Sequence, residues 1–423
     1  MAPRFRMTGW RASVSREFTV FAASVTTLQG ARFLYSLAVA SVVSLADFAL
    51  WALLAALITY APALMLGVVN GMAREVPILL GASRDQEATS DEVATWWSGL
   101  AAISIIAVVG VIGVAAQVVE PAPAGAVVFA LAAAVLFQIQ QFVFRSRLAF
   151  GSASLQQGTM GVGLLVMSVA LITADGATFV VAALGHGVAQ GVAVVAGFLQ
   201  DRPAAGRFSP ATFRRLVGIG LPIMLVGVLF SVFITADRWV ATTVLGPAGA
   251  APYALASVIG SALLVLPSVI SQHTYPRMAV MLGQSNDPGR AYEMASRQNR
   301  FALLATIPVA VIVAVGAAAL IPPLFSAYSA AVAPTIVLCA GLVALSAFSG
   351  YGNFLNVMNA QWTYFRVQMA SLAGALVAMV GGALWLGLIG IGLAAAGAYL
   401  VYGVLLARAA ASVRRRAEAA PWR

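Results

Sequence analysis

The feature that most constrains this chain is its repeated apolar runs of about 20 residues, the length needed to cross the ~30 Å hydrocarbon core of a bilayer. No stretch between the runs reaches about 40 residues, the lower size for a free-standing domain. Because 61% of the residues are apolar and only 9% are charged, a soluble fold could not bury the apolar surface. We therefore expect an all-α integral membrane protein. The twelve runs lie near 18–41, 48–70, 97–119, 123–144, 151–173, 177–198, 216–236, 251–271, 301–321, 331–351, 366–386 and 388–407.

The arginines predict how these twelve runs cross the membrane. They occur in both tails and in loops 71–96, 145–150, 199–215, 273–300 and 352–365, the last followed by Arg366. The intervening loops instead carry Asp47, Glu120, Asp175 and Asp237, with Arg238 as the exception. Under the positive-inside rule, both termini are therefore cytoplasmic. The net charge of +10 reflects this orientation and does not indicate a nucleic-acid partner.

A shift of 202 positions reveals an internal repeat. It aligns Trp51 with Tyr253, Gly81 with Gly283, Asp85 with Asp287 and Pro121 with Pro323. Because each half holds six spans, both halves enter the membrane in the same orientation, as in parallel-repeat transporters. The predicted halves are 1–200, a six-helix bundle, and 201–423, a second six-helix bundle with a basic cytoplasmic tail.

Two charged segments resemble helix starts. Thr89-Ser90-Asp91-Glu92 matches a capping box, and Asp287 before Pro288 matches an N-cap followed by proline at the first helical position. We expect both segments to mark the start of a helix and not to form ligand sites. The acids Asp91 and Glu92 lie in a loop rich in arginine, so we interpret them as solvated surface.

Catalytic and metal-binding patterns are missing from the sequence. The single cysteine, Cys339, excludes an internal disulfide and a cysteine-based metal cluster. We find no His-x-x-x-His pair, no nucleophile with a nearby base and no phosphate-binding glycine loop with lysine. The sequence thus predicts no catalytic residue, no metal and no cofactor. The first run is too long for the core of a cleaved signal peptide, so we expect it to be retained.

Arg32 is the clearest polar residue inside a predicted span. It lies sixteen residues beyond Arg16, about 24 Å along a helix, which places it in the outer half of the first span. A charge at this depth costs free energy and commonly marks a pathway or cavity. Two interpretations stay open: the side chain reaches the outer headgroups, or it faces a central cavity.

Asp237 and Arg238 are the equivalent feature of the second half, near the outer end of the seventh span. Arg238 falls within about one helical turn of the position equivalent to Arg32. The planar guanidinium matches phosphate oxygens, so a cavity lined by both arginines favours a phosphate-bearing anion. A simple Asp–Arg anchor at the interface is the alternative.

Amides and further arginines lie at the ends of other spans. The fourth span ends with Gln138, Gln140, Gln141, Arg145 and Arg147, and the tenth with Asn353, Asn356 and Asn359. The three-residue spacing of the asparagines places them along one helix face. Such amides could bind sugar hydroxyls, or could satisfy neighbouring helices. In the sixth span, His186 and Gln190 are one turn apart, which fits a proton relay or, as we favour, a packed hydrogen-bonded side chain.

Several short motifs occur in the order typical of one family. They are Leu66-Gly67-Val68-Val69-Asn70-Gly71, Arg74-Glu75-Val76-Pro77, Asp237-Arg238, Leu245-Gly246, Tyr253-Ala254-Leu255-Ala256 and Tyr275-Pro276-Arg277. With twelve spans, the chain resembles the Wzx-type polysaccharide (O-antigen) flippases of the multidrug/oligosaccharidyl-lipid/polysaccharide exporter superfamily. The resemblance implies a MATE-like fold of two parallel six-helix bundles around a central cavity.

The resemblance also implies a function. The expected substrate is a polyprenyl-pyrophosphate-linked oligosaccharide, moved across the bacterial cytoplasmic membrane by alternating access. The expected partners are this substrate, membrane lipid, a polysaccharide polymerase and glycosyltransferases. Arg32, Arg145 and Arg238 with Asp237 are the candidates for the pyrophosphate, and Asn353 and Asn356 for the sugar.

Two alternatives remain. Multidrug extruders of the same superfamily generally use acids inside the membrane to couple Na⁺ or H⁺, and here we expect no Asp or Glu in the middle of a span. A membrane-embedded glycosyltransferase or polymerase would need catalytic carboxylates or a large outer loop, and neither is visible.

Overall fold

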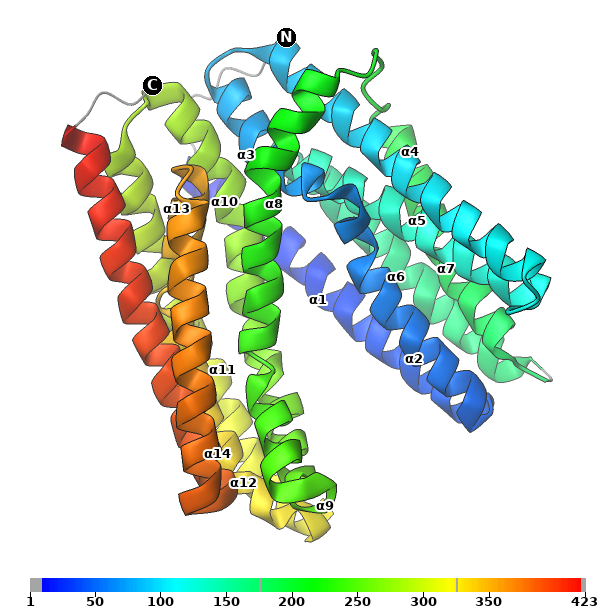
Figure 1. Ribbon diagram of the computed structural model, residues 1–423, viewed down its shortest axis with the longest axis vertical. Helices are drawn as coiled ribbons and strands as arrows, with labels where there is room; N and C mark the ends of the chain where they lie inside the picture. The colour runs from blue at the N-terminus through cyan, green and yellow to red at the C-terminus, as the bar shows by residue number, and fades with distance from the viewer. Residues whose placement is uncertain (1–9, 175, 325, 420–423) are drawn as a thin grey trace. The chain divides into compact units, whose positions relative to one another are not determined.

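The computed structural model describes residues 10–174, 176–324 and 326–419. Within these ranges the chain forms α-helices and short 3-10 helices and contains no β-strand. It divides into two compact units, Met1–Leu221 and Pro222–Arg423 (Figure 1). The division falls inside one helix. The halves 1–200 and 201–423 that the repeat suggests stay a prediction.

The first unit contains seven helices, one short 3-10 turn and the start of an eighth helix. They are α1 (Trp10–Val42), α2 (Leu45–Tyr60), η1 (Ala61–Met65), α3 (Val68–Gly81), α4 (Asp85–Ala115), α5 (Pro121–Ser146), α6 (Phe150–Thr173), α7 (Phe179–Gln200) and α8 (Pro210–Phe233).

Small residues allow the helices of the first unit to pack closely. The core is built mainly by α1, α5, α6 and α7, and alanines such as Ala130, Ala134, Ala182 and Ala193 are fully buried in it. Between helices in a membrane the hydrophobic effect contributes little, so close van der Waals packing of this kind drives association. The packing fixes α1 against α6, the interface that carries the polar residues described below.

The predicted second span is bent. The segments Leu53–Met65 and Val68–Gly81 meet at 62°, and the bend follows from left-handed backbone at Leu66 and Gly67. Glycine tolerates this conformation without a steric cost. A side chain at Gly67 would also lie 2.5 Å from the carbonyl carbon of Gly220 in α8. The bend therefore brings two glycines together and lets α8 begin directly against α3.

The second unit continues from α8 through six further α-helices and two 3-10 turns. They are α9 (Ala236–Ser261), η2 (Ala262–Leu264), α10 (Val265–Ser285), α11 (Pro288–Leu324), η3 (Ser326–Ala331), α12 (Val332–Ser346), α13 (Ser349–Val357) and α14 (Gln361–Ala419).

The long α14 is a hairpin of two helices. Gly387, with φ 60° and ψ −135°, breaks its helical backbone. The chain reverses there, and its two arms lie side by side. Gly382 and Gly390 are so close that a side chain on either would collide with the other's carbonyl. Further along the arms, Tyr402 donates a hydrogen bond to Tyr364 at 3.2 Å. The turn falls at the residue between the predicted spans 366–386 and 388–407.

The described part of the chain holds nine helices that are long and apolar enough to cross a membrane, or ten with the bent pair. The hairpin α14 counts once among the nine and supplies one more crossing. The 33 residues of α1 are long enough to cross, although Arg16, Glu17 and Arg32 lower its hydropathy. Since α1 is not among the helices that are apolar enough, the count of twelve spans stays a prediction.

One predicted helix start is confirmed and the other is wrong. Asp287 caps α11: its Oδ1 accepts hydrogen bonds from the amides of Gly289 (2.9 Å) and Arg290 (3.2 Å). In contrast, α4 begins at Asp85, so the expected capping box at Thr89 lies inside the helix. There the Thr89 hydroxyl donates to the Asp85 carbonyl.

We predict that Gly220→Ala destabilises the protein, because a Cβ at this position collides with the backbone of Gly67. Overpacking of this kind costs about 1–3 kcal/mol. Thermal melting of the purified protein in detergent, followed by tryptophan fluorescence, measures the change. Gly218→Ala is the matched control, since its Cβ would meet nothing within 4 Å. Equal melting temperatures for the two variants would contradict the close contact of α3 and α8.

Candidate functional site

Arg32 is a half-buried cation on α1 that faces α6. Its Nη2 lies 4.0 Å from the Sδ of Met160. No carboxylate pairs with it among the residues that the structure describes. A guanidinium at membrane depth without an acidic partner retains its full attraction for an anionic ligand.

An aromatic cluster fixes α1 one turn beyond Arg32. The Tyr35 hydroxyl donates a 2.6 Å hydrogen bond to the carbonyl of Ala182 in α7. The Tyr35 ring lies 5.3 Å from that of Trp51, and the Trp51 ring lies 5.5 Å from that of His186. His186 is 5% exposed. These contacts agree with a packed side chain, but the buried Nδ1 of His186 has no hydrogen-bond partner among the described residues, so the expected hydrogen bond is not found at this atom.

Buried amides connect four helices near the same α1–α6 interface. Gln141 donates to Gln156 (2.7 Å), Gln157 donates to Gln141 (2.7 Å), and Ser24 of α1 donates to Gln157 (2.9 Å). Gln156 also donates to Gln140, which donates to the Val194 carbonyl of α7 at 3.1 Å. The network satisfies its own amides and holds α1, α5, α6 and α7 in register.

Sequence reasoning found only half of this amide network. Gln140 and Gln141 stood out at the end of the fourth span, whereas Gln156 and Gln157 did not. The available signal was a second Gln-Gln pair sixteen residues later, on the next span and at a similar distance from the connecting loop. Two such pairs on consecutive antiparallel helices can meet across the interface.

Arg145 lies in the last turn of α5. Its Nε donates a 3.0 Å hydrogen bond to the Gln141 carbonyl, and its guanidinium lies 4.4 Å from the centre of the Phe142 ring. A cation in the last turn also interacts favourably with the helix dipole. The structure thus gives Arg145 local partners at the end of α5.

In the second unit, Asp237 is a buried carboxylate with three donors. It is 2% exposed and accepts hydrogen bonds from the amide of Arg238 (2.8 Å), the hydroxyl of Tyr253 (3.0 Å) and the hydroxyl of Ser257 (3.1 Å). Arg238 in turn donates to the Ser257 carbonyl at 3.1 Å. The pair is therefore built into the packing of α9.

The surroundings of Asp237 correct one expectation. The sequence suggested a loop after residue 236, whereas α9 begins at Ala236 and Pro210–Gly246 forms one helical stretch that contains an apolar window long enough to cross a membrane. Asp237 lies towards the end of this stretch, beside Arg238. The expectation that no acid lies in the middle of a span stays a prediction.

Asn353 makes three contacts with neighbouring helices. It accepts from the Ser271 hydroxyl (3.0 Å) and donates to Gln298 (3.1 Å) and to the Ser271 carbonyl (3.4 Å). Asn356 is half-buried and its carbonyl accepts from Gln361 at 3.3 Å. The expected strip of three amides is interrupted, because α13 ends at Val357 and Asn359 has left-handed backbone.

Asp91 and Glu92 also differ from expectation: they are buried, at 0% and 2% exposure, and not solvated. Arg215 of α8 pairs with Asp91, and also with Glu75 at 3.1 Å. Arg147, between α5 and α6, pairs with Glu92 and Asp201. The hydrogen bond with Glu92 raises the pKa of Arg147 above its ordinary value. These ion pairs join α4 to the start of α8 and to the α5–α6 turn.

Within each unit, the candidate residues do not converge on a single site. Arg32 shares the α1–α6 interface with the amide network in the first unit. Asp237, Arg238 and, separately, Asn353 belong to the packing of the second unit. Arg145 lies apart from Arg32 at the end of α5. Whether any of these residues binds substrate stays a prediction.

The helices have the fold of the MATE transporters. A mutant of the Vibrio cholerae MATE transporter VcmN is similar with a TM-score of 0.79 and 16% identity, over 96% of this chain and 98% of that one. An outward-facing multidrug resistance MATE family transporter of the MOP superfamily gives 0.73 and 17%, over 95% and 96%. The eukaryotic MATE transporter AtDTX14 gives 0.71 and 13%, over 95% and 98%.

No family model and no curated protein matches the chain. At these low identities the likeness establishes the fold alone. The expected all-α fold of this type is thereby confirmed, and the chain is a multi-pass membrane protein by the length and composition of its helices.

We predict that Arg215→Ala destabilises the protein, because it leaves the buried carboxylate of Asp91 without its cation. Removing one partner of a buried pair is costly, and since Arg215 is 40% exposed we expect about 2 kcal/mol. Asp91→Asn in the same chain should recover most of the loss. Thermal melting of the two variants measures both effects. A double variant no more stable than Arg215→Ala would show that Arg215 acts through other contacts.

Proposed function

We propose that the chain is a transporter that moves an amphipathic, phosphate-bearing anion across the membrane by alternating access. The substrate that we favour is a polyprenyl-pyrophosphate-linked oligosaccharide, for surface polysaccharide synthesis at a bacterial cytoplasmic membrane. The MATE fold supports transport, and the ordered motifs around Asp237 and Tyr275 support this substrate.

Arg32 is the observation that carries the proposal. A cation kept at membrane depth without an acidic partner costs free energy, and the surrounding packing does not remove that cost. The aromatic cluster and the amide network hold α1 on both sides of Arg32, so the guanidinium has a defined position. A pyrophosphate would supply the missing negative charge and accept paired hydrogen bonds from the planar guanidinium.

The absence of catalytic patterns in the sequence supports transport over chemistry. The acids of the first unit that could act as bases, Asp91 and Glu92, are engaged by Arg215 and Arg147. Asp237 is surrounded by a backbone amide and two hydroxyls, with no nucleophile–base pair at that site. A glycosyltransferase or polymerase activity is therefore less well supported.

Cation-coupled multidrug extrusion is the second candidate, and Asp237 is the observation that favours it. This acid is buried and lies towards the end of a helical stretch that could cross a membrane. Acids buried at membrane depth are the kind of residue that couples H⁺ or Na⁺ movement to transport. A multidrug resistance transporter is among the proteins of similar fold. The two candidates differ in the charge of the substrate and in the residue on which transport depends.

The deciding experiment uses the purified protein in liposomes loaded with a fluorescent polyprenyl-pyrophosphate oligosaccharide. We expect the lipid to change leaflets, and Arg32→Gln to slow this about tenfold or more, since a charged hydrogen bond contributes ~1.5–3 kcal/mol. Arg32→Lys should retain part of the rate. Arg297→Ala, a 72% exposed arginine of a surface pair, should leave the rate unchanged.

The opposite result would identify the second candidate. If the wild-type protein does not move the lipid but expels cationic dyes along a proton or sodium gradient, the proposal is wrong. In that case Asp237→Asn should abolish dye transport while Arg32→Gln has little effect. In cells, normal surface polysaccharide together with heightened sensitivity to cationic drugs after loss of the protein would point the same way.

A further inference from the structure

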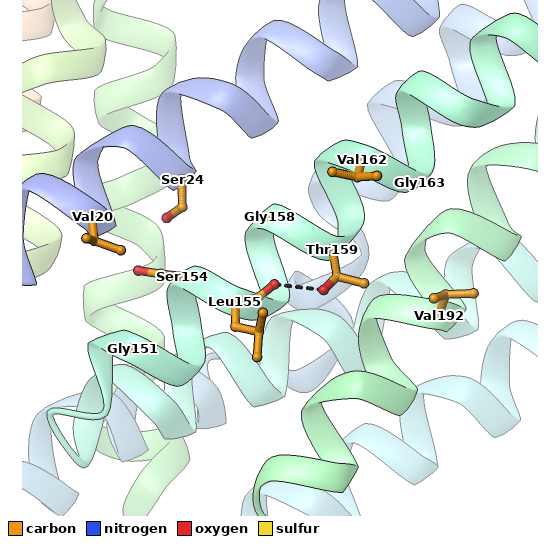
Figure 2. A pocket seen from close by; sticks show the side chains of 10 residues that line it. All are labelled: Val20, Ser24, Gly151, Ser154, Leu155, Gly158, Thr159, Val162, Gly163 and Val192. Atoms are coloured by element: carbon orange, nitrogen blue, oxygen red, sulfur yellow. Dashed lines mark hydrogen bonds between the residues drawn. The ribbon is translucent and has the colours of Figure 1, made fainter.

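A groove of about 650 Å³ runs along α6 in the first unit. Figure 2 shows its lining: α1 contributes one side, α6 the floor and α7 the far end. The lining residues are Val20, Ser24, Gly151, Ser154, Leu155, Gly158, Thr159, Val162, Gly163 and Val192. Its size lies within the ~300–1,000 Å³ of known ligand sites, and its lining is apolar except for three hydroxyls.

Ser154 is the one hydroxyl of the groove that lacks a partner. Ser24 donates to Phe21 and Gln157, and Thr159 donates to the Leu155 carbonyl. The Ser154 Oγ makes no hydrogen bond in the described part of the chain, although the residue is only 6% exposed. Its side chain points from α6 towards α1, into the groove (Figure 2). A buried hydroxyl without a partner can donate a hydrogen bond to an acceptor that a ligand supplies.

The groove has the length of one leaflet. Gly151 and Gly163 are twelve residues apart on α6, which is about 18 Å along the helix, close to half of the ~30 Å hydrocarbon core. Ser154 lies in the first turns of α6, at the end that the arginine distribution places towards the cytoplasm. The opposite end, at Val162, Gly163 and Val192, lies deeper and carries no unpaired polar group.

Glycines keep the groove open. A side chain at Gly151 or Gly158 would meet nothing within 4 Å, and both residues have ordinary helical backbone. Packing and backbone conformation therefore do not require glycine here, where alanine would strengthen the helix by about 1 kcal/mol. What the two glycines provide is the space of the groove.

A positively charged side chain, that of Arg16, lies near the cytoplasmic end of the groove. Arg16 is exposed and lies four residues before Val20 on α1, so the two occupy one helix face. A ligand that fills the groove and emerges at this end would meet Ser154 first and Arg16 next. That order suits a lipid with an oxygen at the start of its chain and an anionic head beyond it.

We propose that this groove holds the single hydrocarbon chain of a polyprenyl phosphate lipid of the cytoplasmic leaflet, with its first oxygen accepting from Ser154 and its phosphate near Arg16. The inference deepens the proposed function by giving the lipid chain of the substrate a place on α6. We choose a lipid with a single chain because the groove follows one helix, α6, between α1 and α7. One cation, Arg16, lies at its end, which suits one phosphate head group.

The test is photo-crosslinking of the full-length protein in phosphatidylcholine nanodiscs with a polyprenyl phosphate that carries a diazirine on its chain. We expect label on the peptide 150–163, and excess unlabelled polyprenyl phosphate should suppress it. Gly158→Leu fills the groove and should reduce labelling about tenfold. Gly125→Leu is the matched control, since its side chain also meets no neighbour but lies outside the groove, and it should label as the wild type does.

Several outcomes would overturn the inference. They are label outside α1, α6 and α7, equal labelling of Gly158→Leu and the wild type, or competition by phosphatidylglycerol as strong as by polyprenyl phosphate. Melting temperatures equal to the wild type verify folding. If Gly158→Leu does not fold, the map of labelled peptides in the wild type and in Ser154→Ala decides, with a lower affinity expected for Ser154→Ala.

Binding and transport can fail separately. If the groove is labelled but the oligosaccharide lipid does not move in liposomes, the groove binds the lipid chain as proposed and the proposed transport function is wrong. If the lipid moves, Arg32→Gln slows this movement and the groove is not labelled, the proposed function holds and the proposed lipid site in the groove is wrong.

Discussion

The constraint on which this structure depends is that a polar group inside a bilayer must find its partner within the protein or its ligand. Backbone groups meet the constraint by forming helices, and every described element is helical. Side chains meet it through the glutamine network of α1, α5, α6 and α7 and through the hydroxyls around Asp237. Several buried polar atoms of the described residues do not meet it, among them the Ser154 hydroxyl, the Nδ1 of His186 and the side-chain amide of Gln368. Arg32, whose printed contact is the Met160 thioether, and Ser154, which lines a groove, are the two that the proposals use.

The same constraint explains how α8 is anchored. Its first turns lie against α3 through two glycines and against α4 through Arg215 and the buried Asp91, all within the first unit. After Leu221 the helix belongs to the second unit, and Pro222, which cannot donate a backbone hydrogen bond, follows at once. A helix fixed at one end and weakened directly beyond that end can bend there. The alternating access that we propose would require flexibility at such a position.

Features set by neighbouring residues could be predicted from the sequence. The spans, the turn at Gly387 and the cap at Asp287 depend on hydropathy, glycine and proline within a few positions. Burial of Asp91 and Glu92 could not be predicted, because their partners Arg215 and Arg147 are 124 and 55 residues away. Burial of Asp237 depends on Tyr253 and Ser257, which lie 16 and 20 residues further along the chain. The glutamine network requires knowledge of which helices meet.

Arg32 and Asp237 differ in what their surroundings leave for a ligand. Three donors already surround the Asp237 carboxylate, and Arg238 lies beside it, so a proton or cation would have to compete with existing contacts. Among the described residues, the hydrogen-bond contact of Arg32 is a thioether at 4.0 Å, a weak acceptor, and an incoming anion would displace little. The positive charge of Arg32 is therefore less compensated by its surroundings than the negative charge of Asp237. This asymmetry is the physical reason to favour an anionic substrate.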